Sequence, residues 1–102
     1  MTGHSAERMF AADHPAALGH FPGNPIIPGA FLLREIVRAI ALAHPGQVCR
    51  ALSAAKFLHP VRPGQGVAIT WTGAGSGEIR FTCSLADGGV RVVAGTLRLG
   101  SP

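Results

Sequence analysis

The residues best suited to chemistry lie in one ten-residue stretch that holds a histidine, three prolines and two glycines. It reads His20-Phe21-Pro22-Gly23-Asn24-Pro25-Ile26-Ile27-Pro28-Gly29. Proline fixes φ and glycine tolerates positive φ, so we expect a rigid, tightly shaped loop. An imidazole can take up a proton near neutral pH, which makes His20 a candidate general base. The alternative is a histidine that only braces the loop by hydrogen bonding.

A helix is expected directly after this loop, from residue 29 or 30 to residue 43. Pro28-Gly29 suits a helix start, and His44-Pro45-Gly46 suits a helix end. The positive end of the helix dipole would then face the loop, and Gly29 would let a ligand approach the backbone. The stretch therefore predicts a base beside a helix start, where the N–H of Gly29 or a neighbour could stabilise negative charge.

Three charged side chains lie on the expected helix, within a sector of roughly 100° on a helical wheel. Glu35 is either a rim carboxylate paired with Arg38 at i,i+3 or a catalytic acid. Arg34 keeps its charge and cannot usefully transfer a proton. It either binds a carboxylate, phosphate or carbonyl oxygen in a pocket or extends to the edge as a surface residue. Every other helix residue is apolar, which favours a mostly buried helix.

The loop resembles the signature of a known family, the hot-dog-fold (3R)-hydroxyacyl-acyl-carrier-protein dehydratases, whose motif reads His-Phe-Pro-Gly-x-Pro-x-x-Pro-Gly. A second block resembles that family's Phe-x-x-Pro-Val-x-Pro-Gly turn; it reads Lys56-Phe57-Leu58-His59-Pro60-Val61-Arg62-Pro63-Gly64-Gln65. The resemblance covers the chain from about residue 11 onward. It implies an α+β hot dog fold, an antiparallel sheet wrapped around one central helix, as a single domain over residues 1–102. It also implies a homodimer with two sheets joined side by side.

The resemblance further implies a 3-hydroxyacyl-thioester dehydratase of fatty-acid, polyene or polyketide synthesis. Its substrate would be carried by an acyl carrier protein or CoA, and no cofactor or metal would be needed. His20 would be the base, and the acid would be Glu35, water or another group. Arg34 would be a further substrate-binding residue. Side chains that could line an acyl tunnel, with ordinary core packing as the alternative for each, are Phe21, Ile26, Phe31 and Phe57.

One departure from the family pattern opens other hypotheses. The family's catalytic Glu or Asp lies fourteen residues after the histidine, where this chain has Arg34, and an acid follows only at Glu35. Arg34 therefore favours a second hypothesis, a catalytically impaired acyl-thioester-binding or partner subunit. A third hypothesis is thioesterase chemistry, which the same fold hosts. That reaction needs a carboxylate, and Glu35 is the only one near the motif.

The rest of the chain predicts an antiparallel sheet. One-sided alternation and short glycine-rich connections, at 73–77 and 87–89, favour strands with a polar outer face. Residues 1–7 are expected to be frayed, and 8–11 to form a short first strand. The other expected strands cover residues 48–58, 67–72, 78–85 and 90–99. The remaining histidines beside prolines, His14, His44 and His59, are interpreted as turn, structural or exposed residues.

Composition narrows the class of protein. The 102 residues are 47% hydrophobic and 14% charged, which fits one compact domain whose small core would profit from association. No apolar run suits a membrane span, and the N-terminus shows no secretory signal, so we expect a cytoplasmic protein. Cys49 and Cys83 are expected to be core fillers without metal-ligand spacing. The net charge is +4, but the Lys and Arg residues form no cluster in the sequence, which argues against nucleic acid as a partner. The family resemblance implies an acidic carrier protein, which a basic surface would suit.

Overall fold

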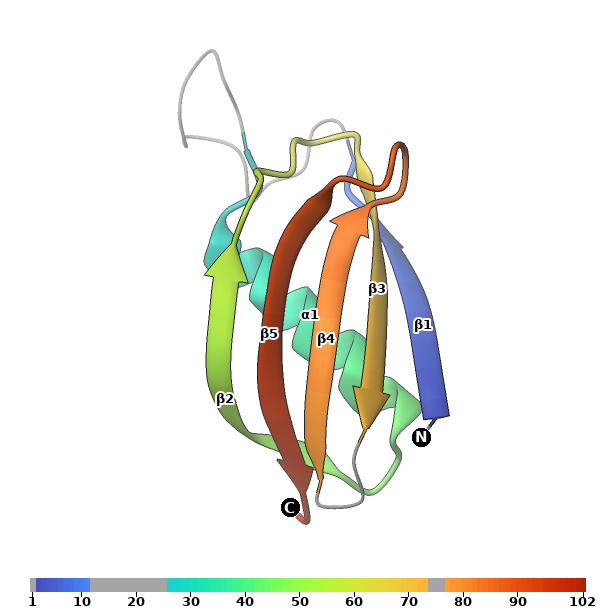
Figure 1. Cartoon of the computed structure of the whole chain (residues 1–102), viewed down its shortest axis with the longest axis vertical. Helices are drawn as coiled ribbons and strands as arrows, with labels where there is room; N and C mark the ends of the chain where they lie inside the picture. Colours follow the sequence, from blue (N-terminus) through green and yellow to red (C-terminus); the bar gives the residue numbers. More distant parts are fainter. Residues whose placement is uncertain (1, 12–25, 74–76) are drawn as a thin grey trace.

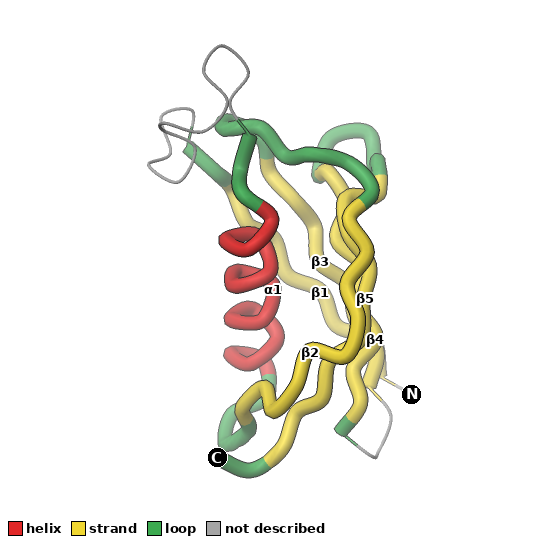
Figure 2. Tube along the Cα trace, turned by 90° about the vertical axis from the view of Figure 1, so that its left-hand side faces the viewer, coloured by secondary structure: helices red, strands yellow, loops and turns green. Residues whose placement is uncertain are grey.

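The computed structural model describes residues 2–11, 26–73 and 77–102. One helix, α1 (Gly29–Ala43), accompanies five strands. The strands are β1 (Thr2–Met9), β2 (Val48–Phe57), β3 (Gly66–Gly73), β4 (Glu78–Leu85) and β5 (Arg91–Gly100). They form a single antiparallel sheet in the order β1-β3-β4-β5-β2, with β1 and β2 at its edges (Figure 1). The sheet curves around α1, which lies along its inner side (Figure 2). The predicted α+β hot-dog arrangement is confirmed.

The helix is held by an apolar stripe at helical spacing. Its buried side chains are Leu32, Ile36, Ala39 and Ile40. They recur at i, i+4, i+7 and i+8, which places them on one face of an α-helix. This face packs into a core built from the inward-facing side chains of the central strands. The predicted bounds of the helix are confirmed, from Gly29 to Ala43.

The central strands alternate as the sequence predicts. On β4, residues Ile79, Phe81, Cys83 and Leu85 are buried, while Glu78 and Arg80 are exposed. The bounds predicted for β4 are confirmed, and those of β2, β3 and β5 differ from the prediction by one residue at one or both ends. The outward face of the sheet is polar because successive side chains of a strand point to opposite faces.

The prediction for the N-terminus was wrong. Residues from Thr2 to Glu7 are not frayed, because they belong to β1, whose eight residues all pair with β3. Glycine, serine and glutamate have low strand propensity, so the local pattern was too weak to reveal the strand. Strand β1 is stabilised instead by its hydrogen bonds to β3 and by partial burial of His4 and Ala6 on the inner face of the sheet.

The opposite edge, β2, has few neighbours. Nearly every residue of this strand is exposed, including Val48, Leu52 and Phe57. Two irregularities interrupt its pairing with β5, one between Cys49 and Ala51 and the other between Leu52 and Ala54. An exposed apolar edge strand is a surface prepared to pair with another chain. Among the described residues, no helix has the length and apolar character needed to cross a membrane.

Candidate active site

A hollow of about 350 Å³ opens where α1 begins. It lies between the start of the helix and the chain that leaves β2, at the end of the molecule where β2 points in Figure 1. Its floor is apolar and buried. Its lining residues come from two segments and are Ile26, Ile27, Gly29, Leu32, Phe57, Leu58, His59, Pro60 and Val61. Eight of these nine described residues belong to the two motif blocks, and Leu32 comes from the first turn of α1.

Backbone hydrogen bonds fix the two segments to each other and to the sheet. The N–H of Ile27 donates to the carbonyl oxygen of Val61 over 2.7 Å, which ties the approach to the helix to the turn after β2. The N–H groups of Leu58 and His59 both donate to the carbonyl oxygen of Val92, at 2.7 and 3.3 Å. Paired main-chain groups of this kind keep the wall of a pocket in place without a regular strand or helix.

An aromatic ring covers Gly29. A Cβ built on Gly29 would lie 3.0 Å from two ring carbons of Phe57, closer than ordinary van der Waals contact. The Phe57 side chain is 50% exposed, so its ring covers the helix start without being locked in the core. Glycine thus lets a flat apolar group, or a ligand that displaces it, touch the backbone.

The beginning of α1 lacks a capping side chain. Pro28 occupies the N-cap position with φ −58° and ψ 142°, and its carbonyl accepts the N–H of Leu32 at 3.0 Å. No side chain of the described residues caps the helix, and its first turn holds no acidic residue. Among the described residues, the first N–H groups and the positive dipole end of α1 therefore have no side-chain partner, an arrangement that suits an anionic ligand.

In the part of the chain that the structure describes, His59 contributes the only ionisable side chain that lines this hollow. Its Nδ1 lies 2.7 Å from the carbonyl oxygen of Pro60. A carbonyl oxygen only accepts hydrogen bonds, so Nδ1 carries a hydrogen and donates. His59 was not among the site residues predicted from the sequence. A histidine that comes three residues before Arg62 in the second motif block was the available signal, but its position beside proline made it look like a simple turn.

The other predicted site residues are distributed around the helix. Arg34 is exposed, and Glu35 forms an ion pair with Arg38 at 3.7 Å; neither Arg34 nor Glu35 lines the hollow. Phe31 is partly buried against the core, and its ring meets that of Phe10 edge-on at 6.2 Å. The structure brings together Ile26, Gly29 and Phe57 from the predicted set. His20 and Phe21 lie outside the described residues.

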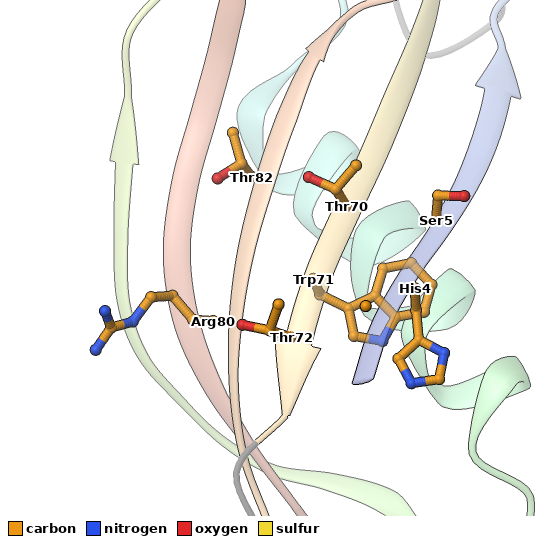
Figure 3. A pocket seen from close by; sticks show the side chains of 8 residues that line it. His4, Ser5, Thr70, Trp71, Thr72, Arg80 and Thr82 are labelled. Atoms are coloured by element: carbon orange, nitrogen blue, oxygen red, sulfur yellow. The ribbon is translucent and has the colours of Figure 1, made fainter. Parts of the chain in front are cut away.

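A second hollow, of about 440 Å³, lies over β1, β3 and β4 (Figure 3). Its lining combines the rings of His4 and Trp71 with hydroxyl groups and one guanidinium, from Ser5, Thr70, Thr72, Thr82 and Arg80. It is wide and open, and its hydroxyls come from the outer face of the sheet. No sequence motif pointed to it. The apolar hollow at the helix start is the better candidate for an acyl chain because apolar pockets with few polar groups are typical ligand sites.

An aromatic cluster closes the other end of α1, and it was also missed. The indole N–H of Trp71 donates to Nε2 of His44 over 3.1 Å. The His4 ring stacks on Trp71, with ring centroids 5.5 Å apart and an interplanar angle of 12° (Figure 3). His4 also meets His44 edge-on at 4.9 Å. Residues 27 positions and more apart in the sequence meet here, which no local pattern reveals.

The two cysteines are free, as predicted. Burial raises the pKa of the Cys83 thiol to about 11, so this thiol stays protonated near neutral pH and is no nucleophile. Within the residues that the structure describes, no group of three His, Cys, Asp or Glu side chains could hold a metal ion.

Comparison with known proteins places these features in a family. The model of a family described as ApeI-like, ApeI dehydratase, matches residues 2–96. The chain is 32% identical, over 90 residues, to the 3-hydroxyacyl-[acyl-carrier-protein] dehydratase FabZ of Chloroflexus aggregans. This match covers 74% of the chain, and the chain spans only 62% of that relative's length.

Solved structures share the fold. The dehydratase heterocomplex ApeI:P from Xenorhabdus doucetiae matches with a TM-score of 0.78 and 20% identity, over 95% of this chain and 86% of that one. An uncharacterized protein from Erwinia carotovora subsp. atroseptica also reaches a TM-score of 0.78, with 23% identity, over 97% of this chain and 83% of the other.

Proposed function

The chain belongs to the ApeI-like dehydratase family, and from this premise we propose that it dehydrates 3-hydroxyacyl thioesters. The observation that carries the proposal is the apolar hollow at the uncapped start of α1, formed by the two motif blocks. The substrate would be an acyl chain of fatty-acid, polyene or polyketide synthesis on an acyl carrier protein or CoA. The named activity of the Chloroflexus relative supports this substrate class.

The reaction removes an α-proton and a β-hydroxyl group and leaves an enoyl thioester and water. In our proposal His20, the histidine of the family motif, takes the α-proton. The N–H of Gly29 or a neighbour donates to the thioester oxygen as it gains negative charge, helped by the helix dipole. Phe57, together with Phe21 and Phe31, contributes apolar surface for the acyl chain. Glu35 is the carboxylate nearest to the motif and the first candidate for the acid, beside Arg34 as a polar substrate contact.

We propose that the chain works as a dimer joined along β2. This edge strand exposes Leu52 at 41% and Phe57 at 50% of their surface, and its backbone edge opposite β5 has no neighbour within the described residues. Antiparallel pairing of two copies would extend the sheet and cover these side chains. The ApeI:P structure is a heterocomplex, so a homologous partner chain is the alternative to a second copy. The free thiols suit a reducing compartment, and we propose the cytoplasm.

An absorbance assay tests the function. Hydration of an enoyl thioester and dehydration of a 3-hydroxyacyl thioester are followed with the wild-type protein and with His20→Ala. Turnover that falls about 100-fold or more in the variant supports the enzyme, because general base catalysis contributes on that scale. No turnover at high protein concentration, together with saturable binding of an acyl carrier protein, would refute the dehydratase proposal and support the second candidate function.

That second candidate is an acyl-thioester-binding or partner subunit. Arg34 favours it, since an exposed arginine stands where the family has its acid. A gain of dehydration in Arg34→Glu would show a functional pocket that lacks only the acid. The dimer is tested separately by light scattering: Leu52→Lys, which places charge on the exposed face of β2, should shift the protein from dimer to monomer, and a wild-type monomer would refute a homodimer.

A further inference from the structure

Among the described residues, His59 is the one ionisable side chain that lines the hollow at the start of α1. Of the nine described residues that line it, seven are aliphatic, aromatic or proline, one is Gly29, and the last is His59. An apolar pocket with one convergent polar side chain is the usual design of a site that holds a hydrocarbon chain and acts on a polar atom. The polar side chain is therefore expected to meet the reacting part of the substrate.

Three backbone hydrogen bonds hold the segment around His59. The N–H of His59 donates to the carbonyl oxygen of Val92 on the neighbouring strand β5. The preceding residue, Leu58, donates to the same oxygen, and Val61 accepts from Ile27 next to the helix start. These hydrogen bonds hold the Cα of His59 in place relative to Gly29. A side chain that transfers a proton needs such a fixed position.

The imidazole ring has a hydrogen-bond partner of its own, the carbonyl oxygen of Pro60. Because Nδ1 donates to the carbonyl oxygen of Pro60, a neutral ring has its lone pair on Nε2 and a protonated ring has an N–H there. In a catalytic histidine, a hydrogen bond made by one ring nitrogen sets both the tautomer and the orientation of the ring. The atom left for substrate is Nε2. The His59 side chain is exposed, so solvent can restore its proton after each turnover.

Arg34, at the family's acid position, and Glu35, one residue later, are less suited to this task. The Arg34 guanidinium is exposed and keeps its proton. The Glu35 carboxylate is 22% exposed, is paired with Arg38 and does not line the hollow.

We propose that His59 is the proton donor for the leaving hydroxyl group, taking the role that the family's helix carboxylate has at the position of Arg34. The inference rests on the proposed dehydratase function. As the base removes the α-proton, its electron pair forms the carbon–carbon double bond and the bond between the β-carbon and oxygen breaks. The oxygen takes the proton from Nε2 of the imidazolium and leaves as water. His59 ends neutral and regains a proton from solvent; in hydration the same steps run backwards.

Two amide variants separate proton transfer from simpler roles. His59→Asn keeps an amide N–H near the position of Nδ1, so it can still donate to Pro60, but it lacks Nε2. His59→Gln places a hydrogen-bonding amide near the position of Nε2, yet cannot deliver a proton. The measurement is kcat and KM for hydration of an enoyl thioester, with thermal unfolding recorded for each variant. His44→Gln, at the other end of α1, is the matched control.

Proton transfer predicts that both variants lose about 100-fold or more in kcat, with KM changed less, while the control keeps wild-type kcat. Near-normal kcat in His59→Asn would reduce His59 to a brace of the turn and overturn the inference. Wild-type kcat in His59→Gln would show a hydrogen bond without proton transfer and overturn it too. Both of these results leave the proposed function intact, whereas a wild-type protein without turnover removes the function and the inference together.

Discussion

The two ends of α1 are built in opposite ways. At its C-terminal end, His44 accepts a hydrogen bond from Trp71, which is 3% exposed, and the ring of His4 stacks on the indole. At its N-terminal end, no described side chain caps the helix, and the ring that covers Gly29 belongs to the half-exposed Phe57. One end is closed by packed and hydrogen-bonded rings, and the other is open beneath a movable one.

This difference separates stability from function. A buried indole with a hydrogen-bonded N–H contributes to the folded state through its packed area and its satisfied donor. A helix start without a capping side chain among the described residues contributes little to folding, because its first N–H groups gain no side-chain partner there. The N–H groups at the helix start become stabilising only when a ligand places negative charge next to them. We therefore expect substitutions at the C-terminal end to lower stability and substitutions at the N-terminal end to lower activity.

The largest effect is expected from Trp71→Ala. Removing a fully buried aromatic side chain costs about 3–5 kcal/mol of unfolding free energy. The matched change at the other end, Phe57→Ala, should cost about 1 kcal/mol because half of that side chain already contacts water. Urea unfolding measures both. Equal losses at the two sites would erase the contrast between a packed end and an open end.

Gly29→Ala should affect turnover instead. The new methyl group meets the Phe57 ring at 3.0 Å and forces it away or blocks the helix start. We expect kcat/KM to fall roughly 100-fold, the scale for one disturbed oxyanion donor. Stability should change little, since alanine is the better helix former. A wild-type kcat/KM would contradict the role of the helix start.

The double variant with Phe57→Ala identifies the cause of that loss. If Gly29→Ala acts only by moving the ring, it has no further effect once the ring is gone. If the methyl group itself excludes the thioester, the loss persists in the double variant. The comparison of single and double variants is a double-mutant cycle applied to kcat/KM.

How far the sequence predicted the molecule depended on whether the signal was local. Helix α1 and strand β4 were predicted with their bounds, since proline, glycine and the spacing of apolar residues act within a few positions. Gly29 and Phe57 were each predicted as site residues, but the contact between them was not predicted. Strand β1 was missed because its support comes from β3, whose paired residues lie 57 or more positions away along the chain.

The aromatic cluster at the C-terminal end shows the same limit more strongly. His4, His44 and Trp71 come from β1, the end of α1 and β3, and each alone looks unremarkable in the sequence. His59 was visible in a motif block, but its hydrogen bond to Pro60 and its place in the hollow are facts of the folded chain. Residue type indicates what a side chain could do, and only its surroundings decide whether it does it.

A smaller effect is expected for the hydrogen bond between Trp71 and His44. Trp71→Phe removes the indole N–H and His44→Ala removes the acceptor. Combined in a double-mutant cycle, they should give a coupling energy of about 1 kcal/mol, the usual net value of a neutral hydrogen bond. Urea unfolding of the four proteins measures it. A coupling near zero would mean that packing of the rings alone closes this end of the helix.

The smallest effect is expected at Glu35, on the face of α1 between the two ends. Its ion pair with Arg38 spans 3.7 Å, and the arginine side chain is 62% exposed, so solvent screens the attraction. Glu35→Gln should change the unfolding free energy by about 0.5 kcal/mol or less. If His59 supplies the proton, kcat should also stay within about twofold of the wild type, well below the loss of a general acid. The opposite result would be a Glu35→Gln variant that turns over about 100-fold more slowly together with a fully active His59→Asn variant. It would identify the Glu35 carboxylate, and not His59, as the proton donor.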